Sequence, residues 1–144
     1  MTYTYEFLPD VALADTAFRV KADNWSQLFA GASEALTSVM IDLADLEQKR
    51  RISIDLTAPT VGELFYDWLS ELVYLKDAEA FLAQSVKIDV LPGGAIWQLR
   101  GELLGDTIRP KQQKLGQDVK AITYHLFDVA HEGPNFTAQV VLDI

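Results

Sequence analysis

The architecture of this chain is easiest to read in residues 51–76, which have the sequence RISIDLTAPTVGELFYDWLSELVYLK. Up to Thr57, apolar and polar residues alternate, which predicts a strand with one face in water. From Thr60 to Lys76, apolar residues recur every three or four positions, which predicts a helix with one buried face. Thr60 followed by Glu63 is typical of a helix start. The segment therefore indicates a chain that mixes strands and amphipathic helices.

The rest of the chain repeats these two patterns. A second amphipathic helix is predicted over residues 24–43, and Asn24 with Gln27 resembles a capping box. Further strands are expected at residues 2–8, 16–20, 85–91, 95–103, 120–130 and 136–144. The turn sequence at residues 92–94 should pair its neighbouring strands antiparallel. We expect an α+β fold, a single domain over residues 1–144, with two helices packed on a mainly antiparallel β-sheet.

Composition narrows the function classes. The 144 residues are enough for one hydrophobic core, and 49% of them are apolar. A net charge of −9 repels nucleic-acid phosphates and anionic membranes, so we expect neither strong direct nucleic-acid binding nor membrane binding. The absence of cysteine excludes thiolate metal sites and cysteine nucleophiles. With no signal peptide and no apolar run of about 20 residues, a cytoplasmic protein is expected.

Familiar catalytic motifs are scarce. No glycine-rich loop precedes a helix as in a P-loop or a dinucleotide site, and no serine lies in a nucleophile elbow. Two histidines, His125 expected in a strand and His131 expected in a turn, are too few for a histidine-rich zinc site. His125 is expected to be structural. An aperiodic stretch at residues 105–117 is expected to be a long exposed loop, and residues 109–120 have a net charge of +3.

The C-terminal residues are the most informative candidates for chemistry. Asp143 lies one residue from Ile144, whose α-carboxylate would end the last predicted strand. Two adjacent anions repel unless a cation compensates them, and carboxylate oxygens suit a hard divalent ion. Asp15, before the second strand, is the leading third ligand, and Asp10 is a weaker one. The alternative is that Asp143 is merely solvated and Asp15 is a turn residue.

Two C-terminal runs carry a resemblance to a known family. They are residues 119–125, VKAITYH, and residues 138–144, AQVVLDI. The other matching positions are Tyr5, Glu6, Phe7, Leu8, Ala14, Asp15, Leu69, Glu71, Leu72, Gly101, Glu102, Leu115 and Gly116. Together these motifs span essentially the whole chain and resemble those of the archease family.

The resemblance implies an accessory protein and not an enzyme. Archeases assist the RNA-splicing ligase that joins a 2′,3′-cyclic phosphate or 3′-phosphate end to a 5′-hydroxyl end, by promoting guanylylation of the ligase and multiple turnover. The family's metal site falls here on Asp15, Asp143 and the terminal carboxylate of Ile144, and Lys120 matches the lysine linked to activation. The resemblance thus implies the RNA-splicing ligase as partner and a divalent ion as cofactor, Ca²⁺ in isolation, or Mg²⁺ or Mn²⁺. A homo-oligomer is compatible with it.

The chain departs from the family pattern at two places. Residues 9–15 read PDVALAD, with extra residues and no histidine, and residues 112–114 read QQK where relatives often carry a histidine. Asp10 and Glu102 are further candidates for lining the site. Two other functions stay open at this point, a stand-alone metal-dependent phosphoester hydrolase and a chaperone-like or oligomeric binding module.

Overall fold

The computed structural model describes residues 2–9 and 16–144. The elements, in chain order, are β1 (Tyr3–Phe7), β2 (Thr16–Ala22), α1 (Trp25–Met40), the short 3-10 helix η1 (Leu43–Asp45), β3 (Arg50–Ala58), α2 (Val61–Glu79), β4 (Phe81–Gly93), β5 (Ile96–Thr107), β6 (Ala121–Ile122), β7 (Asp128–Glu132) and β8 (Asn135–Asp143). None of the described helices is both long enough and apolar enough to cross a membrane.

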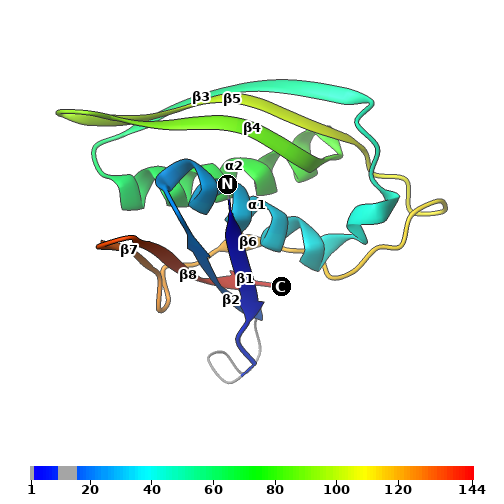
Figure 1. Ribbon diagram of the computed structural model, residues 1–144. Helices are drawn as coiled ribbons and strands as arrows, with labels where there is room; N and C mark the ends of the chain where they lie inside the picture. Colours follow the sequence, from blue (N-terminus) through cyan, green and yellow to red (C-terminus); the bar gives the residue numbers. More distant parts are fainter. Residues whose placement is uncertain (1, 10–15) are drawn as a thin grey trace.

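The two long helices form a layer between two antiparallel sheets (Figure 1). One sheet has the order β3-β5-β4, and the other has the order β1-β2-β8-β6, with β7 also paired to β8. The predicted α+β class is confirmed, but the strands divide between two sheets on opposite sides of the helices. Alternation along a strand predicts one wet face, as β3 has, but it does not say which strands share a sheet.

The strand β8 is the centre of the five-stranded sheet. Along one edge it pairs with β2, from Thr16 opposite Leu142 to Ala22 opposite Phe136. Along its other edge it pairs with β6 at one end and with β7 at the other. This register places the start of β2, the end of β8 and the strand β6 side by side.

The prediction of a continuous strand over residues 120–130 was wrong. Residues 123–127 leave the sheet and form a turn between β6 and β7, with Leu126 at a φ of +53°. In a strand, the side chains of Tyr124 and Phe127 would point to opposite faces. In the structure both rings contact Tyr66 of α2, so packing against the helix breaks the strand.

The two helices begin where the sequence predicts. The Asn24 side chain accepts a hydrogen bond from the Gln27 amide (2.8 Å), and the Thr60 hydroxyl accepts one from the Glu63 amide (3.1 Å). Their ends differ from the prediction, because α1 stops at Met40 and α2 continues to Glu79. Helix starts are encoded locally by the cap, whereas these ends depend on the neighbouring strands.

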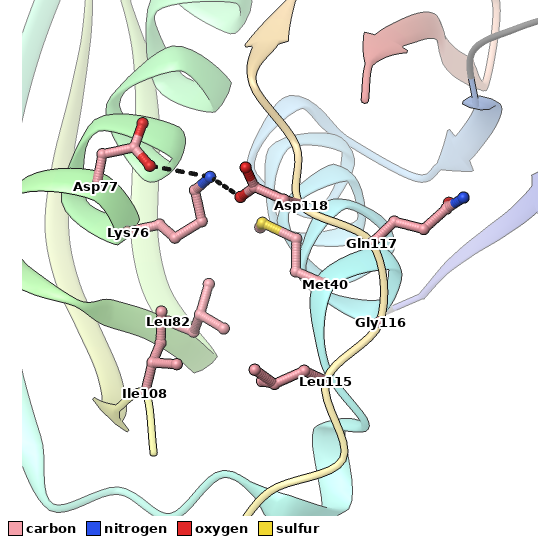
Figure 2. A pocket seen from close by; sticks show the side chains of 9 residues that line it. All are labelled: Met40, Lys76, Asp77, Leu82, Ile108, Leu115, Gly116, Gln117 and Asp118. Carbon is pink, nitrogen blue, oxygen red and sulfur yellow. Dashed lines mark hydrogen bonds and ion pairs between the residues drawn. The ribbon is translucent and has the colours of Figure 1, made fainter. Parts of the chain in front are cut away.

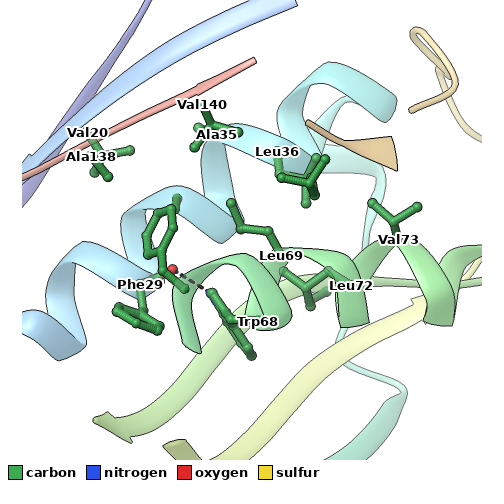
Figure 3. Packing of buried hydrophobic residues seen from close by; sticks show 14 of the residues in the cluster. Val20, Phe29, Ala35, Leu36, Trp68, Leu69, Leu72, Val73, Ala138 and Val140 are labelled. Atoms are coloured by element: carbon green, nitrogen blue, oxygen red, sulfur yellow. Dashed lines mark hydrogen bonds between the residues drawn. The ribbon is translucent and has the colours of Figure 1, made fainter. Parts of the chain in front are cut away.

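The core lies between the two sheets and around both helices (Figure 3). Its buried side chains include Phe18 and Val20 of β2, Phe29 and Leu36 of α1, Phe65, Trp68 and Leu69 of α2, Leu99 and Leu103 of β5, and Val140 of β8. The indole N–H of Trp68 donates a hydrogen bond to the main-chain oxygen of Phe29 (2.9 Å), which links the two helices inside the core. The aperiodic stretch is shorter than expected, because β5 extends to Thr107.

Candidate functional site

The end of β8 lies against the segment that carries Lys120. The Lys120 amide donates a hydrogen bond to the main-chain oxygen of Asp143 (2.7 Å), and Ala121 pairs with Asp143 in the sheet. Asp143 and Ile144 are half-buried, and Lys120 is exposed. The structure therefore brings together three of the residues expected at the site, Lys120, Asp143 and Ile144.

The two other aspartates expected nearby, Asp10 and Asp15, lie outside the described residues. Thr16, which follows Asp15 in the chain, pairs with Leu142, and its hydroxyl donates a hydrogen bond to the Gln117 side chain (3.3 Å). Within residues 2–9 and 16–144, no three histidine, cysteine, aspartate or glutamate side chains form a cluster that could hold a metal ion. Because the expected ligand set includes Asp15, the metal site stays a prediction.

Glu102 lies in the other sheet. It is a residue of β5, opposite Ser53 of β3 and Lys87 of β4, and its carboxylate forms an ion pair with Arg51 (3.4 Å). The helices separate this sheet from β8 (Figure 1). The structure therefore does not bring Glu102 together with Asp143.

Each histidine lies in the type of element that was expected for the other. His125 is exposed in the turn after β6, and it was wrong to place it in a strand. His131 lies in β7 and not in a turn, with its ring stacked on Phe136 (3.8 Å between centroids). The break in the expected strand explains both errors. The turn between β6 and β7 includes His125, and β7 continues past His131.

The segment before Lys120 is fixed by the C-terminal ends of both helices. The amides of Gly116 and Gln117 donate hydrogen bonds to the main-chain oxygens of Met40 (2.8 Å) and Val39 (2.9 Å) at the end of α1. A Cβ atom on Gly116 would lie 2.3 Å from the Val39 oxygen, so this close approach requires glycine. These contacts hold the chain that leads to Lys120 against α1.

A buried lysine on α2 fixes the next residues. The side chain of Lys76 is only 7% exposed, and its ammonium group bonds to the Asp118 carboxylate, the Asp77 carboxylate (3.0 Å) and the main-chain oxygen of Val119 (2.7 Å). Figure 2 shows this ammonium group between the two carboxylates. Lys76 thus anchors the residue that immediately precedes Lys120.

The sequence analysis did not assign this role to Lys76. A signal was present, because Lys76 continues the row of buried positions that includes Leu69, Leu72 and Val73. A lysine on the apolar face of a helix needs a partner for its charge. Burial acts to lower the pKa of Lys76, but the hydrogen bonds and charges of Asp118 and Asp77 outweigh it and raise the pKa above its ordinary value.

A cavity of about 300 Å³ lies beside this lysine (Figure 2). Its walls are mainly apolar and include Met40, Leu82, Ile108 and Leu115. The Lys76 ammonium group at its edge is already bonded to three oxygens, so this cation is not available to a ligand in the cavity. The cavity therefore adds no chemistry to the site at Lys120 and Asp143.

Comparisons with known proteins identify the family. The archease protein family matches residues 5–144. Protein archease of Archaeoglobus fulgidus is 32% identical over 140 residues, which cover 97% of this chain and 98% of that protein. Protein archease of Methanopyrus kandleri is 30% identical over 131 residues, which cover 91% of this chain and 94% of that protein.

A solved structure shares the fold. The solution structure of Methanobacterium thermoautotrophicum protein 1598 superposes with a TM-score of 0.84 at 27% sequence identity, and the match covers 97% of this chain and 98% of that one. The family match over nearly all of the sequence and the shared fold lead to one assignment. The chain belongs to the archease family, whose members are non-catalytic activators of an RNA ligase.

Proposed function

We propose that this protein activates an RNA-splicing ligase through a divalent metal ion and Lys120, at the place where β2 begins and β8 ends. The observation that carries the proposal is the main-chain hydrogen bond from the Lys120 amide to the Asp143 carbonyl, which brings the backbones of these two residues together at one end of the sheet. These residues come from separate parts of the sequence and meet only in the folded sheet.

The donor set fits a hard cation. The proposed ligands are the carboxylates of Asp15 and Asp143 and the α-carboxylate of Ile144, all of which supply oxygen, as Ca²⁺, Mg²⁺ and Mn²⁺ prefer. When bound, such an ion neutralises the negative charge of the ligands and of phosphate oxygens placed against it. Lys120 is exposed and supplies a compact positive charge for an anionic group of the ligase complex.

The partner follows from the family and from the charge of the chain. A protein with a net charge of −9 is repelled by RNA and attracted to the basic surface of an RNA-binding enzyme. We therefore propose that the ligase, and not the RNA, is bound directly, and that the encounter takes place in the cytoplasm. A stand-alone phosphoester hydrolase is not supported, because archeases are not catalysts.

The test is a reconstituted ligation assay at limiting metal. Asp143→Ala, Lys120→Ala and an extension of a few residues after Ile144 should each abolish stimulation and leave the thermal unfolding midpoint within a few degrees of wild type. Asp128→Asn, an exposed carboxylate on β7, is the control and should stimulate like wild type. Full stimulation by Asp143→Ala and by the extended chain would refute the metal site.

Two further measurements separate the alternatives. Hydrolysis of phosphoesters by the purified protein alone would favour the hydrolase. If Ca²⁺ and Mg²⁺ leave the unfolding midpoint unchanged while the protein still binds unrelated clients, the binding-module hypothesis is favoured, since a ligand that binds only the folded state must stabilise it.

A further inference from the structure

The turn between β6 and β7 exposes two large apolar side chains. Tyr124 is 64% exposed and Leu126 is 49% exposed. Exposed apolar side chains close together in one turn are candidates for a contact with a partner, provided that their surroundings supply further recognition chemistry. We call Glu63, Tyr66, Asp67, Tyr124 and Leu126 together the Tyr124 surface.

The side chains and backbone of this surface are held by several contacts. The ring of Tyr124 stacks on the ring of Tyr66 with centroids 4.1 Å apart and planes 7° apart, and Phe127 contacts both rings edge-on at 5.7 and 5.9 Å. The Tyr66 hydroxyl donates a hydrogen bond to the Ile122 oxygen (3.1 Å), and the Gln139 amide group donates one to the Leu126 oxygen (3.1 Å). An aromatic group held in place before binding loses little conformational entropy when a partner docks.

The same surface carries two carboxylates that form no ion pair with any described residue. Glu63 and Asp67 lie one turn apart on α2, on either side of the position of Tyr66, and like charges at this spacing destabilise a helix. In the described part of the chain, no lysine or arginine nitrogen lies within 4 Å of either carboxylate. Burial and the charge of Glu63 raise the pKa of Asp67. The pKa of Tyr124 is also raised, first by local desolvation of an otherwise exposed side chain and then by the charges of Tyr66, Asp67 and Glu63.

These features define the chemistry of the occupant. The exposed face of a tyrosine ring attracts a cation, and carboxylates beside it bind a guanidinium group through charge-assisted hydrogen bonds. A nucleobase could also stack on the ring, but its phosphates would be repelled by Glu63 and Asp67. The surface therefore fits an arginine side chain of a protein and not a nucleic acid.

The Tyr124 surface and the candidate site share one chain segment. Tyr124 is four residues beyond Lys120, and the segment between them pairs with β8 through Ala121 opposite Asp143 and Ile122 opposite Leu142. The amide and hydroxyl groups of Thr123 both donate hydrogen bonds to the Val141 oxygen (3.1 and 3.0 Å). These bonds fix the segment that joins Lys120 to Tyr124 along the end of β8.

We propose that the Tyr124 surface docks an arginine-bearing basic segment of the ligase, with the guanidinium group stacked on Tyr124 and paired with Asp67 and Glu63. This inference rests on the proposed function, because the ligase is taken as the partner. Docking here supplies affinity, whereas the site at Lys120 and Asp143 supplies activation.

The test measures the dissociation constant of the full-length protein for the ligase, without RNA. Tyr124→Ala and the double variant Glu63→Gln/Asp67→Asn should each weaken binding about tenfold, and Asp67→Lys should weaken it more. Tyr124→Phe should bind within about twofold of wild type, because phenylalanine keeps the ring. Two matched controls should bind like wild type: Tyr74→Ala, a tyrosine 60% exposed further along α2, and Glu6→Gln/Glu132→Gln, which removes the same charge elsewhere.

The outcomes separate this inference from the proposed function. Asp143→Asn should bind the ligase normally without stimulating it, while Tyr124→Ala should stimulate fully once its concentration is raised above its weaker dissociation constant. If Tyr124→Ala and the double variant bind like wild type, the docking surface is wrong, whatever Asp143→Asn does. If the Tyr74→Ala control weakens binding as much as Tyr124→Ala, the assignment to an arginine of the ligase is also wrong. The same holds if the wild-type protein binds RNA and Tyr124→Ala abolishes that binding. A ligase that neither binds nor responds to wild type overturns both proposals.

Discussion

A single buried carboxylate determines how the chain leaves β5. Asp106 is 2% exposed, and its side chain accepts hydrogen bonds from the Thr107 amide (2.8 Å) and the Arg109 guanidinium group (3.0 Å). The hydrogen bond from Arg109 lowers the pKa of Asp106, burial opposes this, and the net shift is below the ordinary value. The irregular segment after Thr107 thus begins at a fixed ionic contact.

Asp106→Asn should lower the free energy of unfolding at pH 7 by about 1 to 3 kcal/mol. Because the pKa is lower in the folded than in the unfolded state, the carboxylate stabilises the protein above the unfolded value of 3.8. That contribution is lost as the pH falls through the lower folded pKa. Urea unfolding from pH 7 to pH 2 should therefore show the two proteins converge in acid, and a constant difference would contradict the assignment.

Lys76→Met should destabilise the protein by about 2 kcal/mol at pH 7, because two charge-assisted hydrogen bonds to the segment before Lys120 are lost. Asp118→Asn should cost less, since the Val119 oxygen keeps its bond to Lys76. The raised pKa means that the lysine contributes stability below its unfolded value of 10.5 and loses it as the pH rises through the folded value. Chemical unfolding of both variants checks the order, and a larger effect of Asp118→Asn would contradict it.

Residue-level prediction from sequence succeeded where the interaction is local. The caps Asn24 and Thr60 act within three residues, so the pattern was sufficient. The role of Lys76 depends on Asp118, 42 residues away, and the exposure of His125 depends on the packing of its neighbours on α2. Such contacts leave no periodic signal in the sequence.

At the scale of the elements, the close spacing of β4 and β5 in the three-stranded sheet leads to a prediction for Gly101. Gly101 of β5 has a φ of +156°, and a Cβ atom there would lie 2.0 Å from the Lys87 oxygen of β4. Gly101→Ala should lower the free energy of unfolding by about 2 to 4 kcal/mol, because the strand must shift or strain.

Gly62 provides the control for this substitution. It lies in the first turn of α2, and nothing is within 4 Å of the position of a Cβ atom. Gly62→Ala should therefore stabilise the protein by about 0.5 kcal/mol, since alanine loses less backbone entropy in a helix. Thermal and urea unfolding of the two variants test the pair, and equal effects would show that strand spacing is not limiting at Gly101.

Element type was predictable wherever the periodicity was long and undisturbed, as in β3 and α2. The expected strand at 120–130 failed because alternation continues through residues whose rings pack on a helix instead. At the site, the pairing of Lys120 with the end of β8 could not be read from either strand alone. It depends on the register in which β8 pairs with β2 on one edge and with β6 on the other.

At the scale of the whole molecule, net charge should control the rate of association with the ligase. With a net charge of −9 facing a basic RNA-binding partner, the association rate constant should fall roughly tenfold between low and high salt, while the dissociation rate changes less. Stopped-flow measurements over a range of ionic strengths provide the check. An association rate independent of salt would mean that the acidic body does not steer the encounter.

The α+β class of the whole molecule could be predicted from the sequence, but the order of its layers could not. Strands with one solvent-exposed face and two amphipathic helices can form a fold with one sheet or a fold with two sheets. Side chains of the helix layer such as Trp68 and Phe29 fill the core between the two sheets, and the hydrogen bond from the Trp68 indole to the Phe29 main-chain oxygen holds the two helices together in that layer. The make-up of the candidate site also depends on the layering. Glu102 and Asp143 could be assigned to different sheets only once the layers were known.

The central place of β8 has a consequence for biosynthesis. The edge of β2 that β8 will cover leaves the ribosome well before its partner, because residues 23–134 must be translated in between. At about 5 to 20 residues per second, the nascent chain carries an unfinished sheet for roughly 5 to 20 s. The other sheet closes earlier, since β3, β4 and β5 follow one another with only α2 inserted. A chain stalled after β5 but before β8 has left the ribosome should thus have one half assembled and β2 free to pair with a neighbouring polypeptide, as cross-linking of stalled complexes would reveal.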